Sequence, residues 1–138
     1  MKRDKRPELQ NIVSRASSVA RTEMSMVTIL DEDTQWFIAR VGLEPDHTPR
    51  AHSFCHHAVL TPGEPMIVSD ARHDPRFFEN PLVLSAPHIR FYAGVPLVDS
   101  AGYALGALCV ADTVPRAQFL QLMELVELAR LAERTICR

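Results

Sequence analysis

The residues best suited to chemistry gather in one short stretch, residues 50–60, which reads RAHSFCHHAVL. Cys55 is followed directly by His56 and His57, and His52 lies three residues before it. A thiol among imidazoles suits either nucleophilic catalysis or zinc binding. The stretch therefore offers three candidates: a nucleophile with its base, a metal site, and a structural helix of a binding fold.

The local pattern favours the structural helix. Ser53 is a typical N-cap, so residues 54–60 are predicted to form a short helix behind it. Neighbouring helical side chains diverge by about 100°, so neither adjacent histidine is well placed to act as a base for Cys55. His52 would lie before the cap, which spoils its zinc-like spacing to His56. We therefore predict no catalytic residue and no metal site.

The chain has three cysteines, Cys55, Cys109 and Cys137, and no two of them are close in sequence. An odd, scattered set argues against a disulfide framework and a zinc ribbon. It favours a reducing cytoplasm as the compartment. Because Cys55 lies near the positive end of its predicted helix, a reactive or redox thiol stays open as an alternative. No cofactor can be inferred.

Bulk composition is that of one ordinary globular domain covering residues 1–138. Apolar residues make up 46% of the chain and charged residues 23%. A net charge of −2, from 15 basic and 17 acidic residues, gives no electrostatic case for a nucleic-acid partner. No apolar run reaches the length of about 18 residues that a membrane span needs, and the basic start MKRDKR precedes no apolar segment, so we expect no signal peptide.

Apolar periodicity predicts the elements that position these residues. In order we expect a helix at 7–22, a hairpin of strands 24–30 and 35–41, a short helix at 54–60, a brief strand at 66–70, single-turn helices after Asp74 and Asn80, strands at 89–98 and 103–112, and a long helix at 115–136. This order predicts an α+β fold, with both terminal helices on one face of an antiparallel sheet. The middle segment would cover the other face and leave a pocket there.

Three further residues are candidates for ligand contact in that pocket. Arg90 and Tyr92 share a strand face opposite the apolar one, so they would supply a cation and a hydroxyl. Arg76, in the middle segment, could face an anionic ligand. Together with Cys55 and His56 they form the predicted ligand-binding set.

The long helix carries a second pattern. Apolar residues recur in it at steps of three and four, as in a heptad seam: Leu122, Leu125, Ala129, Ala132 and Ile136. The small alanines permit close approach of another helix. That helix is either the one at residues 7–22 or the same helix of a second subunit, and the seam is predicted to serve dimerisation.

Taken together, the motifs resemble those of a GAF domain, the small-molecule sensor module of signalling proteins. They are SFCHHAV, VSDARHDPRFFENPLV, IRFYAGVPLV and GYALGALCVADTVPR, and their order and spacing cover nearly the whole chain. They are most similar to the bacterial branch that is fused to histidine kinases or diguanylate cyclases. The resemblance implies about six antiparallel strands between the terminal helices and a pocket-forming middle segment.

The resemblance also implies a function. A small molecule, still unidentified, would bind in the pocket, and a shift of the terminal helices would pass its presence to a fused or separate effector, a kinase or a cyclase. GAF domains dimerise through terminal helices, so a parallel homodimer is favoured, and we predict that the chain is not an enzyme. One alternative is a GAF-type free methionine sulfoxide reductase, although LCVADT replaces the acidic LDIDS-like ending typical of those enzymes. The other is a dimerisation module that binds no ligand.

Overall fold

The computed structural model describes residues 5–137 and confirms the predicted α+β fold. Its centre is one antiparallel sheet of six strands in the order β3-β2-β1-β6-β5-β4. The strands are β1 (Met24–Leu30), β2 (Thr34–Val41), β3 (His47–Pro49), β4 (Met66–Val68), β5 (Phe91–Val98) and β6 (Ala104–Asp112). Within residues 5–137, no helix is long and apolar enough to cross a membrane.

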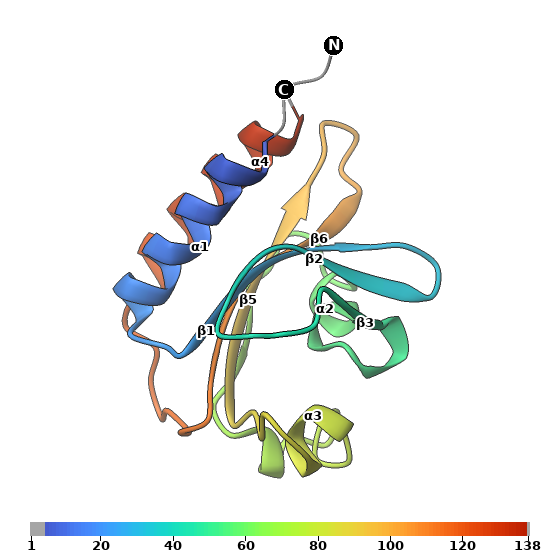
Figure 1. Ribbon diagram of the computed structural model, residues 1–138, viewed down its shortest axis with the longest axis vertical. Coiled ribbons are helices and arrows are strands. Elements are labelled where there is room, and N and C mark those ends of the chain that lie inside the picture. Colours follow the sequence, from blue (N-terminus) through green and yellow to red (C-terminus); the bar gives the residue numbers. More distant parts are fainter. Residues whose placement is uncertain (1–4, 138) are drawn as a thin grey trace.

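Two long helices cover one face of the sheet. They are α1 (Arg6–Ala20) and α4 (Leu122–Cys137), which lie side by side and run in opposite directions (Figure 1). Each turns an apolar stripe toward the sheet. The buried residues of α1 are Leu9, Ile12, Val13, Ala16 and Ala20, and those of α4 include Leu125, Leu128, Ala129 and Ala132. Burial of these stripes forms the larger core of the molecule.

Short elements cover the opposite face. They are the 3₁₀ turn η1 (Arg50–His52), α2 (Phe54–Ala58), the 3₁₀ turn η2 (Ala71–His73) and α3 (Pro81–Leu84). Figure 1 shows them on the side of the sheet away from α1 and α4. A second buried cluster, which includes Phe54, Phe77 and Tyr92, lies between these elements and the sheet.

Strand alternation sorts the central residues between the two clusters. In β5, Phe91 and Val95 face the helices, whereas Tyr92 faces the short elements. In β6, Leu108 faces the helices and Cys109 faces the short elements. The alternation predicted for these two strands is therefore confirmed.

Three parts of the predicted secondary structure need correction. The segment after Asp74 forms turns instead of a helix, although the Asp74 carboxylate accepts a hydrogen bond from Arg76 N as a capping residue would. The last helix begins at Leu122, because Arg116 turns back to bind the backbone carbonyls of Ala20 and Arg21. Strand β3 was missed because it is only three residues long and ends in a proline, Pro49.

Candidate ligand-binding pocket

A cavity of about 300 Å³ lies between the sheet and the short elements. Its floor comes from the strands, and its walls come from the β2–β3 loop, α2 and the segment around α3. The lining residues are Met26, Gln35, Phe37, Gly42, Leu43, Glu44, Pro45, Thr48, Phe54, Cys55, Leu82, Ala86, Pro87, Ile89, Tyr92 and Ala111. The small side chain of Ala111 on the floor helps to leave this space open.

The lining is mostly apolar and carries little charge. None of its described members is Lys, Arg or His, and Glu44, its one carboxylate, is exposed. Gln35 is buried, and its Nε2 donates a hydrogen bond of 2.9 Å to Thr48 Oγ1. The cavity therefore suits an uncharged molecule that makes few polar contacts.

Helix α2 brings Cys55 to the cavity. The Ser53 hydroxyl oxygen accepts a hydrogen bond of 3.0 Å from His56 N, which confirms the predicted N-cap. The Phe54 ring stacks on Phe77 with 4.2 Å between ring centroids. The cap and this stacking fix the helix against the sheet, so that Cys55 is buried at its inner side.

A cluster of four polar side chains lies where Cys55 meets the sheet; we call Thr28, Cys55, Tyr92 and Cys109 the sulfur cluster. The Thr28 hydroxyl donates to Cys55 Sγ at 3.2 Å. Tyr92 Oη lies 3.1 Å from Cys55 Sγ and 3.0 Å from Cys109 Sγ. The two sulfur atoms are 3.1 Å apart. All four residues are buried, and only Cys55 and Tyr92 of the four line the cavity.

The pKa values of the three ionisable groups in the sulfur cluster are shifted in different directions. Burial alone raises the pKa of the Cys55 thiol, but hydrogen bonds from Cys109, Thr28 and Tyr92 outweigh it and lower that pKa below its ordinary value. Burial raises the pKa of Cys109 and of Tyr92, and proximity to Cys55 adds to both increases. The cluster therefore favours a negative charge on Cys55 over one on either neighbour.

Of the five predicted ligand-binding residues, the structure brings Cys55 and Tyr92 to the cavity and leaves the other three outside its lining. His56 Nδ1 accepts a hydrogen bond of 3.1 Å from Arg50 Nε. Arg76 pairs with the carboxylate of Asp74 and contacts the sulfur of Met66.

Arg90 is the third of these. It precedes β5, and its guanidinium donates to the carbonyl oxygen of Val83, 3.0 Å away. It therefore ties α3 to the sheet. The sequence placed Arg90 on the same strand face as Tyr92 because the strand was predicted to begin at residue 89. Strand β5 begins at Phe91, so Arg90 lies outside it and need not share that face.

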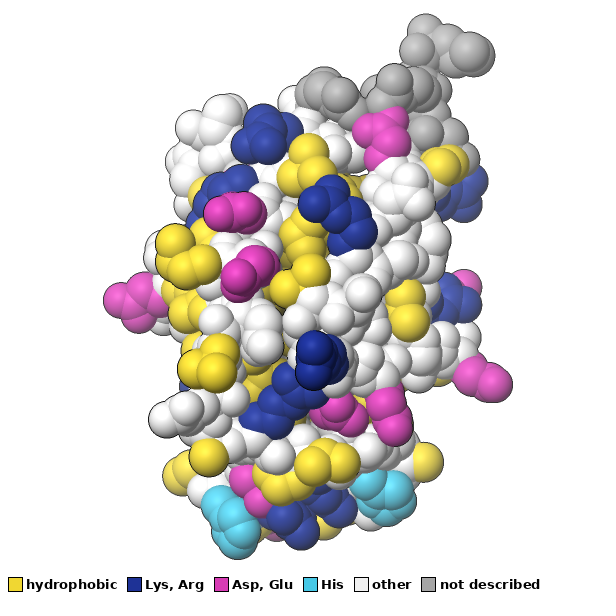
Figure 2. Space-filling model, turned by 90° about the vertical axis from the view of Figure 1, so that its left-hand side faces the viewer, with side chains coloured by type: hydrophobic (Ala, Val, Ile, Leu, Met, Phe, Trp, Pro, Cys, Tyr) yellow, Lys and Arg dark blue, Asp and Glu magenta, His cyan; other side chains and the backbone are white. Residues whose placement is uncertain are grey.

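The structure places three of the five residues predicted for dimerisation inside the chain and leaves Leu122 and Ile136 half-buried. Leu125, Ala129 and Ala132 are buried within the chain, where α1 supplies the facing helix. They are thus unavailable to a second subunit in this fold. The outer surface of α4 and α1 instead carries exposed apolar residues, Met123 and Val19 among them, between charged side chains (Figure 2).

Sequence reasoning missed most of the cavity wall, for example Phe37, Leu43 and Ile89. Their apolar character fits a core as well as a cavity, so no local signal separates them from core residues. The alternation of Ala107, Cys109 and Ala111 on one strand face was a usable signal, because a row of small side chains leaves space above a sheet.

The geometry bears on two candidate chemistries, metal binding and thiol chemistry. Among residues 5–137 there is no group of three or more His, Cys, Asp or Glu side chains placed to hold a metal ion. Two thiols with a phenol beside an apolar cavity make up the reactive groups of the described site.

The family model described as GAF domain matches residues 5–136. The chain belongs to the GAF domain family. A curated relative, a cyclic di-GMP phosphodiesterase of Pseudomonas aeruginosa, is 47% identical over 107 residues, which are 78% of this chain. The match spans only 18% of that relative's length.

Solved structures agree on the fold. The type II free methionine-R-sulfoxide reductase of Thermoplasma acidophilum is similar with a TM-score of 0.77 at 15% identity, over 96% of this chain and 92% of that one. The GAF domain of an Acinetobacter phosphoenolpyruvate-protein phosphotransferase gives 0.74 at 18% identity, over 96% and 82%. At these identities the likeness shows the fold alone.

The reductase match corrects one prediction. We predicted from the resemblance that the chain is not an enzyme, and this prediction is wrong as an inference from the fold. An enzyme shares the whole architecture, so the GAF fold carries no argument against catalysis.

Proposed function

We propose that this GAF domain is a sensory module that binds a small, uncharged, largely apolar molecule in the cavity beneath α2 and α3. The observation that carries the proposal is the cavity's lining, which is apolar and has no Lys, Arg or His among its described residues. A volume of about 300 Å³ is at the lower end of ligand pockets, so the ligand would be compact. Gln35 and Thr48 would orient it through hydrogen bonds.

The lining gives less support to charged ligands. An anionic nucleotide would lose its hydration on entry, and it would find no cation in the described lining to replace that water. Free methionine sulfoxide is a zwitterion, and its carboxylate would meet the same difficulty. We therefore favour an uncharged ligand over both.

Contacts between the sheet and the helices support a route from cavity to surface. The Glu133 carboxylate on α4 accepts a hydrogen bond of 2.8 Å from Val98 N, at the end of β5. Arg116, after β6, binds the carbonyl oxygens of Ala20 and Arg21 at the end of α1. A ligand that shifts β5 or β6 would thereby change the packing of both helices, provided that it prefers one arrangement over the other.

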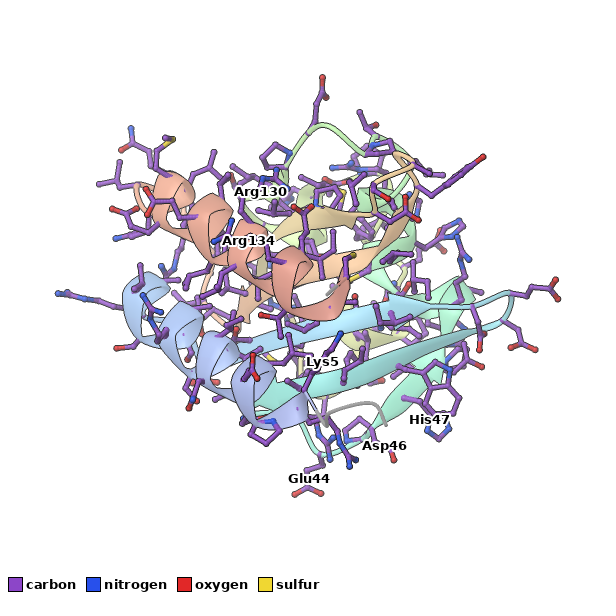
Figure 3. All side chains as sticks on the ribbon, turned by 90° about the horizontal axis from the view of Figure 1, so that it is seen from above. Lys5, Glu44, Asp46, His47, Arg130 and Arg134 are labelled. Atoms are coloured by element: carbon purple, nitrogen blue, oxygen red, sulfur yellow. The ribbon has the colours of Figure 1, made fainter. Side chains whose placement is uncertain are left out.

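The effector and the assembly state belong to the same proposal. The long phosphodiesterase relative supports a role as the regulatory part of a signalling protein, with the effector fused or separate. A shallow groove between α1 and α4 is lined by the apolar residues Val19 and Leu131. Its charged lining residues are basic, among them Arg130 and Arg134 (Figure 3), and acidic, namely Glu124 and Glu127. This surface would suit a homodimer, which analytical ultracentrifugation would detect. A cytoplasmic location stays a prediction.

Titration with an uncharged bicyclic probe, indole, followed by nuclear magnetic resonance, tests the ligand class. We expect shifts at cavity residues, and we expect Ala111→Leu to abolish them by filling the floor. Ala101→Leu, at an exposed position, is the matched control and should leave them unchanged. Cyclic di-GMP serves as the anionic comparison.

Binding of cyclic di-GMP in the cavity, in preference to uncharged probes, would contradict the proposed ligand class. Failure of every uncharged probe in a folded protein would instead support the dimerisation module that binds no ligand.

A further inference from the structure

Cys55 and Cys109 are two free thiols held together beneath the cavity. Their sulfur atoms are 3.1 Å apart, and neither residue is in a disulfide. A disulfide bond has a length of about 2.05 Å, so a relative shift of about 1 Å would join them. One thiol is on α2 and the other on β6, so the bond would fasten the short elements to the middle of the sheet.

The two thiols differ in access. Cys55 lines the cavity, whereas Cys109 lies behind it and is completely buried. A reagent that enters the cavity would therefore meet the sulfur of Cys55 first. Because the described lining has little charge, it would admit an uncharged reagent more readily than a charged one.

The hydrogen bonds favour Cys55 as the thiolate, which is the reactive form of cysteine. A thiolate there would accept hydrogens from Thr28, Tyr92 and Cys109. The Thr28 oxygen accepts a bond of 3.1 Å from Ala107 N, and its own hydrogen has Cys55 Sγ at 3.2 Å as a nearer acceptor than Ala107 O at 3.4 Å. A thiolate at Cys109 would have only Tyr92 and Cys55 as donors in the sulfur cluster.

We propose that Cys55 and Cys109 form an oxidation site for small, uncharged hydroperoxides that enter through the cavity. The Cys55 thiolate would attack the terminal peroxide oxygen, so that an S–O bond forms and the O–O bond breaks. The alcohol leaves with the proton that Cys55 had lost, and Cys55 becomes a sulfenic acid. The sulfur of Cys109 then attacks the sulfur of Cys55, the S–S bond forms, and the S–O bond breaks.

The second step releases water, because the departing hydroxide takes the proton of Cys109. In sum, two thiols and one hydroperoxide give a disulfide, an alcohol and water, with two electrons passing from sulfur to the peroxide. Tyr92 Oη lies within 3.1 Å of both sulfur atoms, which places it to relay the proton. The site goes beyond the proposed function, since it shares the cavity but needs no bound ligand.

The Cys137→Ser protein isolates the site, because it leaves the buried pair as the only cysteines. Treatment with cumene hydroperoxide should remove both thiols, lower the intact mass by two hydrogen atoms, and give a peptide that links Cys55 to Cys109. Dithiothreitol should reverse all three changes. Oxygen addition at Cys55 without the link, or thiols that stay intact, would overturn the proposal.

A resolving-cysteine variant separates the two steps. Cys109→Ala in the Cys137→Ser background should stop at a sulfenic acid on Cys55, captured by dimedone. Circular dichroism checks that this variant folds. If it does not fold, the presence or absence of the Cys55–Cys109 link in the Cys137→Ser protein tests the proposal instead. A dimedone adduct elsewhere, with Cys55 unmodified, would overturn the assignment of the attacking thiol.

Two comparisons test entry through the cavity. Ala111→Leu should slow oxidation by cumene hydroperoxide several-fold relative to the exposed control Ala101→Leu. Oxidised glutathione, which is anionic, should react more slowly than the hydroperoxide with the buried pair. Equal rates in either comparison would overturn this route. A disulfide that forms in a protein that binds no indole would leave this proposal intact and contradict only the proposed function.

Discussion

The two faces of the sheet are covered in different ways. On the helix face, Leu108, Phe91 and Leu125 pack into a core that two long helices close completely. On the other face, short elements held by side-chain caps such as Ser53 and Asn80 surround a cavity. The comparison teaches that strand parity separates the closed core from the cavity, since successive residues of one strand face opposite layers.

The largest expected effect is on the helix face. Leu108→Ala should lower the free energy of unfolding by about 3 kcal/mol, because it removes buried methyl groups and leaves a void. Leu82→Ala, at a half-buried position in the cavity wall, should cost about 1 kcal/mol, because it enlarges an existing space. Urea unfolding followed by circular dichroism measures both. Equal costs would break the distinction between the faces.

A smaller effect is expected where the cavity face is packed most closely. In Gly94→Ala the new Cβ would collide with the Tyr92 ring and its Oη, so the ring must move, at a cost of about 2 kcal/mol. Because Tyr92 belongs to the sulfur cluster, its contacts to both thiols should also weaken. Gly63→Ala, which meets open space, is the matched control in the same unfolding experiment. If Gly94→Ala proves as mild as its control, the packing around Tyr92 is looser than described.

Removal of a cap should affect the cavity wall at modest cost. Asn80 Oδ1 accepts from Leu82 N at 2.8 Å, and its Nδ2 donates to His52 O at 3.0 Å. Asn80→Ala should cost about 1 kcal/mol and weaken binding of indole. Asn80→Asp keeps the cap but loses the donor, so it should recover stability more than affinity. Full recovery of both would show that the bond to His52 is dispensable.

The smallest expected effect is an acid response of the cavity side. Hydrogen bonds from Arg72 lower the pKa of Asp70 from 3.8 to about 2. The unfolded chain therefore takes up this proton first, and the stability that Asp70 contributes above about pH 4 is lost as the pH falls toward 2. The loss should be below about 1 kcal/mol, since Arg72 is exposed. Carboxyl titration by nuclear magnetic resonance gives the midpoint, and one near the ordinary value would contradict the pairing.

Much of the fold could be predicted because apolar periodicity is local. Alternation in β5 and β6 and the helical spacing of α1 predicted the elements and their buried sides. The order of the elements predicted on which face the cavity lies, but its lining could not be predicted in the same way. Gly94 pairs with Cys109 across two strands, and that register depends on the whole sheet.

The helix that packs on the seam of α4 could not be predicted from the sequence either. The spacing of Leu125, Ala129 and Ala132 is the same whether another helix of the chain or a second subunit packs on it. Only the position of α1 decides between them. Likewise, the sulfur cluster unites residues from β1, α2, β5 and β6, which no single motif contains.

One contact between the two long helices has a consequence for protein engineering. Lys5 Nζ donates to the carbonyl oxygen of Ile136 at 3.0 Å, so the start of α1 lies beside the end of α4. A linker of a few residues could therefore join these two points, and the exposed turn at Asp31–Asp33 could supply new termini. Such a circular permutant would keep every layer of the fold while moving the attachment point of a reporter from the helices to the cavity side of the molecule.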